Sequence, residues 1–275
     1  MIKNSFLYRI IIGVAVFVFT YILIFSCNQY ISHLLALSIN TSEGVTFNKV
    51  DYIVSDIAIY RFWSKLKIIY VFATGPFLAL ALGIYALYKS RVVKTPYPYK
   101  YILLWIFFGT FNLFASQIYL GFVGNVDIIP ELYQGFANIF AWLKIPTPIL
   151  GFFAVAFGIF SIIVGYLSAS NFKSFFIPDY KGDYLYIQPS YYITIYFVPV
   201  ILGSVIIYWL STDYSLPIHI VYLISYLIFG LGFLVKQSKR PLSFRSKKPS
   251  TFSHFSFLFL IKVAAIVLLI YFFWR

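Results

Sequence analysis

The stretch ILGFFAVAFGIFSIIVGYL, at residues 149–167, decides the fold class of this chain. It contains nineteen consecutive residues without a charged side chain. A membrane-spanning helix needs about 20 mainly apolar residues, because each residue adds about 1.5 Å and the hydrocarbon layer is about 30 Å thick. We therefore predict that this stretch is a helix that crosses a lipid bilayer.

Comparable stretches recur along the chain. Six further segments are long and apolar enough to cross a membrane, and polar or basic connections separate them. They cover residues 10–35, 68–88, 101–123, 191–210, 218–235 and 257–274. The pattern predicts an all-α fold, a polytopic transmembrane bundle of about seven helices that forms a single domain over residues 1–275.

Composition supports this fold class. The chain of 275 residues is 61% hydrophobic and 11% charged, whereas a soluble domain is about 45–50% apolar and about 25% charged. Lipid must therefore cover much of the surface, and membrane lipid is the first expected partner. The net charge of +13 is explained by basic residues that are retained in cytoplasmic loops, so we expect no nucleic acid partner.

The positions of the basic residues predict the orientation. Arg91, Lys94 and Lys100 fall between the second and third spans, and six more basic residues fall within residues 236–248. Basic loops stay in the cytoplasm, so we expect a bacterial cytoplasmic (inner) membrane protein with a cytoplasmic N-terminus and an external C-terminus. Five residues of the second loop are expected to contact lipid headgroups, and these are Lys239, Arg240, Arg245, Lys247 and Lys248.

The first long loop is expected to contain the one departure from helix. Residues 44–61 alternate partly between β-branched or aromatic residues and polar ones. Such alternation is typical of short strands. We predict a small β-hairpin here, at the membrane surface.

Small residues recur at helical spacing in two of the spans. Such residues allow helix backbones to approach closely in lipid, where packing replaces the hydrophobic effect. The predicted helix-packing face consists of Gly75, Ala79, Gly83, Gly158 and Gly165. It can hold this bundle together or receive a helix of another protein, and the sequence leaves both readings open.

Polar side chains form a stripe in the third span. Asn112 and Ser116 lie one turn apart, with Gln117 beside them. Unpaired amides are costly in hydrocarbon, so the stripe must face protein or water. It either lines a cavity or clamps neighbouring helices by hydrogen bonds. The histidines His33, His219 and His254 are scattered, and we expect them in loops or at the interface.

A series of short motifs runs through the first half of the chain. It comprises Asn28-Gln29-Tyr30-Ile31-Ser32, a β-like loop, Ala73-Thr74-Gly75-Pro76, Phe111-Asn112-Leu113, Gly121 and Gly124-Asn125-Val126-Asp127. This order resembles the site-2 protease family of intramembrane zinc metalloproteases. That family has H-E-x-x-H on its first core helix, a small hairpin, a Gly-Pro that opens the second helix and an Asn…Asp-Gly motif on the third.

The departures from that family concern its chemistry. Asn28, Gln29 and Ser32 stand where the family has His, Glu and His, although zinc binding needs the imidazoles and water activation needs the carboxylate. Asp127 lies several residues beyond the family's spacing for the third ligand. The resemblance therefore implies a scaffold that has lost its metal and needs no cofactor, similar to inactive relatives that bind membrane proteins without cutting them.

These observations give three functional hypotheses. The leading one is a non-catalytic subunit or scaffold that associates with other membrane proteins, because no catalytic or metal motif is complete. The second is a cryptic intramembrane hydrolase or lipid-modifying enzyme that uses a polar cavity. The candidate cavity residues are Asn28, Gln29, Asn112, Ser116, Gln117 and Asp127. The third is a small transporter with helices broken at Pro76 and Pro199.

Overall fold

A computed structural model describes residues 6–39, 64–92, 97–127, 135–173, 192–210, 216–235, 262–263 and 265–266. All regular secondary structure in these ranges is helical. The elements are α1 (Phe6–Ser38), α2 (Lys65–Arg91), α3 (Tyr97–Asp127), α4 (Phe136–Leu143), α5 (Thr147–Lys173), η4 (Ile193–Phe197), α7 (Val198–Leu210) and α8 (Leu216–Val235). The hairpin predicted for residues 44–61 and most of the span predicted for 257–274 lie outside the described residues.

Five of the described helices are long and apolar enough to cross a membrane, namely α1, α2, α3, α5 and α8. The apolar helix over Ile195–Leu210, which includes α7, is shorter. The prediction of a multi-pass helical membrane protein is confirmed at this level. The predicted boundaries of these spans agree with the helices to within a few residues.

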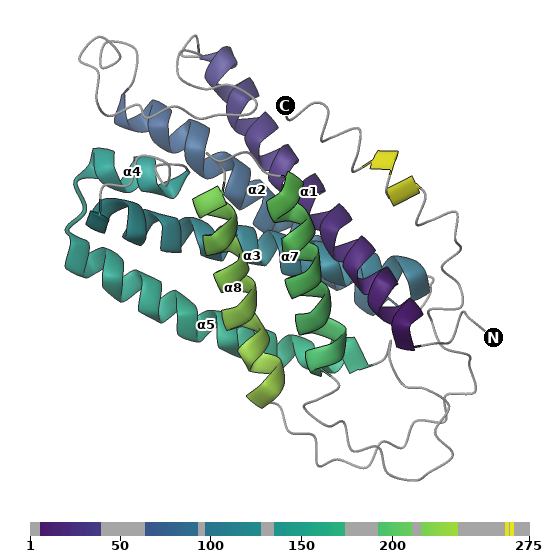
Figure 1. The fold of residues 1–275 in the computed structure, drawn as a ribbon. Coiled ribbons are helices and arrows are strands. Elements are labelled where there is room, and N and C mark those ends of the chain that lie inside the picture. The colour runs from purple at the N-terminus through teal and green to yellow at the C-terminus, as the bar shows by residue number, and fades with distance from the viewer. Residues whose placement is uncertain are drawn as a thin grey trace.

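Successive spanning helices run in opposite directions (Figure 1). α1, α3 and α7 run one way, and α2, α5 and α8 run the other way. Two close contacts follow this arrangement: Asn28 of α1 lies against Gly75 of α2, and Thr110 of α3 lies against Gly83. We call the end of the bundle where α1 begins the proximal end and the opposite end the distal end.

α3 is the central helix of the bundle. It packs against α1, α2, α4, α5 and α8 (Figure 1), and 83% of its apolar span is buried. Only 17% of the span of α5 is buried, because α5 packs mainly against α8 and α3. Most of the α5 span is therefore not covered by the other residues that the structure describes.

Small residues occupy the closest contacts between helices. Gly83 lies against Thr110, and Ala79 packs at the edge of the main core. A side chain at Gly165 would collide with the backbone of α8 at Phe229, since the two helices touch there. Gly158 differs, because a Cβ at this residue would lie 3.8 Å from the hydroxyl of Tyr119 and meet nothing closer.

The two prolines have different effects. Pro76 lies inside α2, which continues through it. Pro199 follows the π-helical turn Ile193–Phe197, in which Val198 donates its N–H to the carbonyl of Ile193. Because proline lacks an N–H and its ring crowds the preceding turn, the wider π turn accommodates it. The ring then packs against Gly13 of α1.

α4 is a short helix that the sequence analysis did not predict. Its Phe136 stacks edge-on against Phe114 of α3, and the ring of Phe140 lies against Gly121. α4 therefore runs parallel to the distal part of α3 (Figure 1). It begins beside Gln117, which lies about 15 Å along the helix axis from Asp127. α4 thus begins well before the level at which α3 ends.

Candidate functional site

The polar stripe of α3 is fully enclosed. Asn112 and Ser116 have no exposed surface, and Gln117 is 3% exposed. These side chains lie in the distal half of the bundle, where α3 faces α8 and α4. Polar groups in such a position need hydrogen-bond partners from the protein.

Gln117 connects three helices. Its Nε2 donates to the hydroxyl of Tyr222 in α8 at 2.8 Å, and its Oε1 accepts the backbone N–H of Phe136 at 3.2 Å. The second bond satisfies an N–H in the first turn of α4, which has no partner within its own helix. Gly135 has a φ of 52° and lies so close to the Gln117 amide that a Cβ would collide with it.

Asn112 forms the second link between α3 and α8. Its Nδ2 donates to the carbonyl of Phe108 at 2.8 Å, and its Oδ1 accepts a hydrogen bond from Ser225 at 2.9 Å. Ser116 donates to the carbonyl of Leu113 at 2.7 Å within its own helix. The stripe therefore acts as a clamp between helices. This was one of the two readings that the sequence left open.

A histidine–tyrosine pair lies beside this clamp. The hydroxyl of Tyr21 in α1 is 2.5 Å from Nδ1 of His219 in α8, and the ring of Phe25 packs against the imidazole. His219 is 7% exposed and lies in the first turn of α8, so it belongs to a helix and not to a loop. The pair joins residues 198 positions apart, and no local sequence signal identifies it.

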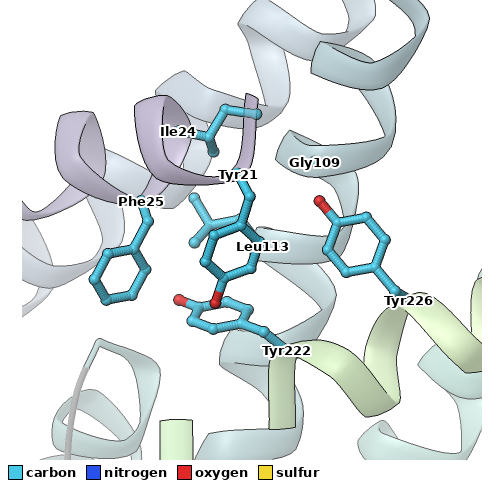
Figure 2. Close-up of a pocket in the computed structure, with 7 residues that line it drawn as sticks. All are labelled: Tyr21, Ile24, Phe25, Gly109, Leu113, Tyr222 and Tyr226. Carbon is cyan, nitrogen blue, oxygen red and sulfur yellow. The ribbon is translucent and has the colours of Figure 1, made fainter. Parts of the chain in front are cut away.

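A small cavity adjoins the pair (Figure 2). It has room for about one water molecule. Figure 2 shows that the rings of Tyr21, Tyr222 and Tyr226 face this space from α1 and α8. The lining is completed by Ile24, Phe25, Gly109 and Leu113. The cavity is too small for a lipid, peptide or sugar substrate.

Two further predicted cavity residues, Asn28 and Gln29, lie on α1. Asn28 is 8% exposed and faces Gly75 of α2, and its Oδ1 has no hydrogen-bond partner among the described residues. Gln29 is half-buried on α1. The side chain of Asp127 lies outside the described part, as do the five basic residues predicted to contact headgroups.

Asn138 is a buried amide that the sequence analysis missed. It lies in the first turn of α4 and has no exposed surface. Neither its Nδ2 nor its Oδ1 has a hydrogen-bond partner in the part of the chain that the structure describes. The only signal in the sequence is a polar residue within the short apolar run at residues 135–143.

Within the described ranges, no three His, Cys, Asp or Glu side chains are grouped so that they could hold a metal ion. Comparisons with family models, with curated proteins and with solved structures give no match to this chain. The resemblance to the site-2 protease family therefore stays a prediction.

Proposed function

We propose that this protein is a non-catalytic, multi-pass membrane subunit or scaffold that associates with other membrane proteins. One observation carries the proposal: the polar side chains of α3 form hydrogen bonds that hold α3, α4 and α8 together. Groups committed to such bonds are unavailable to a substrate. The adjoining cavity, with room for about one water molecule, leaves no space for one.

The proposal also covers the evolutionary origin of the protein and its location and orientation in a membrane. The replacement of His, Glu and His by Asn28, Gln29 and Ser32 is typical of a pseudoenzyme that kept a membrane scaffold. We place the protein in a bacterial cytoplasmic membrane with the proximal end in the cytoplasm. Lys89 and Lys100 lie at that end, near the connection to the basic residues 236–248. A seventh span at 257–274 then places the C-terminus outside.

α5 is the proposed contact with a partner helix. Gly158 follows Ala154 by one helical turn, and a Cβ at Gly158 would meet, among the described residues, only the Tyr119 hydroxyl, at an ordinary van der Waals distance of 3.8 Å. Small residues let a second helix approach closely in lipid, and that approach supplies packing energy that lipid tails do not. This face of α5 would therefore receive a transmembrane helix of another protein.

The test is purification of the tagged protein from its own membranes in mild detergent, followed by mass spectrometry. Wild type should recover a defined set of membrane proteins in fixed proportion. Gly158→Leu should lose them, because the new side chain fills the contact. Ala156→Leu is the matched control, since Ala156 is exposed on another side of α5 and should keep the partners.

The outcome separates this proposal from the alternatives. A solitary protein in the wild-type sample would contradict the subunit function. Equal recovery from all three samples would keep the function and exclude this face of α5 as the contact. Both leucine variants should retain wild-type helical content, which circular dichroism checks.

A further inference from the structure

The first turn of α2 has an unusual charge distribution. It contains Lys65 and Lys67 and no acidic residue. The N-terminus of a helix is the positive end of its dipole, so anions are favoured there and lysines are not. Ser64 caps the helix by accepting the N–H of Lys67 at 3.3 Å. A neutral hydroxyl leaves the positive potential of this helix end in place.

α4 brings a third lysine to the same end of the bundle. Ile139 and Trp142 of α4 pack in one cluster with Ile68, which lies one turn into α2. Lys144 directly follows α4 and is exposed. The negative end of the α4 dipole favours a lysine at position 144. The α2 dipole does not favour Lys65 and Lys67, because both lie at its positive end.

We call Lys65, Lys67 and Lys144 the distal lysine cluster. Lys89 and Arg91 are at the opposite end of α2, about 40 Å away for a helix of this length. The distal lysine cluster is therefore separate from the basic residues at the proximal end of α2. Basic residues are retained on the cytoplasmic side of a membrane. This rule can explain the basic residues at one end of α2, but not those at both ends.

The surface beside the cluster is apolar. Leu66 and Tyr70 are 79% and 47% exposed, and they continue down α2 into the span. Trp142, which is half-buried, lies on the α4 side. Cationic heads above exposed apolar and aromatic side chains match a molecule with an anionic head and acyl chains.

We infer that the distal lysine cluster is a binding site for the headgroup of an anionic phospholipid. The lipid phosphate contacts the lysine ammonium groups and the N-terminal turn of α2. Its acyl chains lie along Leu66 and Tyr70. The site depends on the membrane placement of the bundle and is independent of the proposed partner contact at α5.

The test uses the full chain in vesicles that contain photoactivatable phosphatidylglycerol or photoactivatable phosphatidylcholine. Labelled peptides are located by mass spectrometry. Phosphatidylglycerol should label residues 64–70 and 142–146 several-fold more than phosphatidylcholine does. The triple variant Lys65→Gln, Lys67→Gln, Lys144→Gln should abolish this preference. The matched variant with arginine at the same three positions should keep it.

Three results would overturn the inference. Equal labelling of wild type by the two lipids would show that the headgroup charge is not recognised. A preference that persists in the glutamine variant would place the recognition elsewhere. Loss of labelling on addition of excess inorganic phosphate would identify a site for a free anion. If the glutamine variant does not fold, the two lipids are compared on wild type and on the arginine variant. That comparison still shows whether the cluster recognises the anionic headgroup.

Discussion

The proximal and distal halves of the bundle are held together by different interactions. The proximal core is aromatic: Trp105 of α3 stacks on Tyr196 of η4 with an angle of 3° between the rings, and Tyr196 meets Phe233 of α8 at 4.7 Å between ring centroids. The distal half adds buried hydrogen bonds to its apolar packing, namely the Gln117 clamp and the pair of Tyr21 and His219.

The difference shows what each half requires of its sequence. Aromatic packing depends on volume and on close contact, so several apolar residues can substitute for one another with repacking. Hydrogen bonds in a dry interior depend on specific donors and acceptors, because an unpaired group there is costly. The distal half should therefore tolerate fewer kinds of substitution at its polar positions. The following predictions test the two halves, from the largest expected effect to the smallest.

Gly165→Leu should prevent the native bundle from forming. Its side chain would collide with the backbone of α8 at Phe229 and Gly232. Backbone atoms of a packed helix cannot move aside without a large cost in free energy. Gly158→Leu is the matched control on the same helix and should fold, since a Cβ there lies at an ordinary van der Waals distance, 3.8 Å, from the Tyr119 hydroxyl. Size-exclusion chromatography and circular dichroism in detergent measure the outcome. A well-folded Gly165→Leu protein would refute the close contact of α5 and α8.

Trp105→Ala should lower the free energy of unfolding by about 3 kcal/mol, because the emptied volume removes packing contacts throughout the proximal core. Trp105→Phe should cost clearly less, since an aromatic ring remains opposite Tyr196. Titration of both variants with a denaturing detergent gives the comparison. Equal losses would mean that the stacked ring pair does not contribute to the stability of this half.

Gln117→Leu should lower the free energy of unfolding by about 1–3 kcal/mol, because it leaves the Phe136 N–H and the Tyr222 hydroxyl without this partner. Thr110→Val is the control on the same helix, because the hydrogen bonds described for the Thr110 hydroxyl go to the carbonyls of Ile106 and Phe107 within α3. The same denaturation experiment applies. If Gln117→Leu left the free energy of unfolding unchanged, the clamp would not stabilise the distal half.

Asn138→Leu should raise the free energy of unfolding by about 1 kcal/mol. An apolar side chain of similar size removes the cost of burying an amide without partners. The thermal unfolding temperature should therefore increase slightly. A decrease would show that Asn138 makes a hydrogen bond with the part of the chain beyond the described residues or with another molecule.

The sequence predicted the fold class because length and apolarity determine whether a helix can span a membrane. α4 was missed, since its eight residues are too few for a span and its burial depends on α2 and α3. The run at 135–143, closed by Lys144 and Pro146, has the length of a re-entrant or buried segment. The length of this run was therefore the sequence feature that could have indicated α4.

The candidate site was predictable only in part. The polar stripe of α3 had to face protein or water, and the structure shows that it faces protein. Its partners Tyr222 and Ser225 lie more than 100 residues away in sequence, so no local pattern identifies them. The π turn before Pro199 was similarly hidden, because proline predicts a local disturbance without specifying its form.

The most direct test of this account measures whether water reaches the polar stripe. Ser116→Cys, in a Cys27→Ala background, is treated with a water-soluble thiol reagent while the protein is in vesicles. Lys144→Cys in the same background is the exposed control and should react rapidly. The account predicts that Cys at position 116 stays unmodified, since this position is fully enclosed. Rapid modification at 116 would reveal a water-filled cavity and would contradict the assignment of the stripe as a clamp in a non-catalytic scaffold.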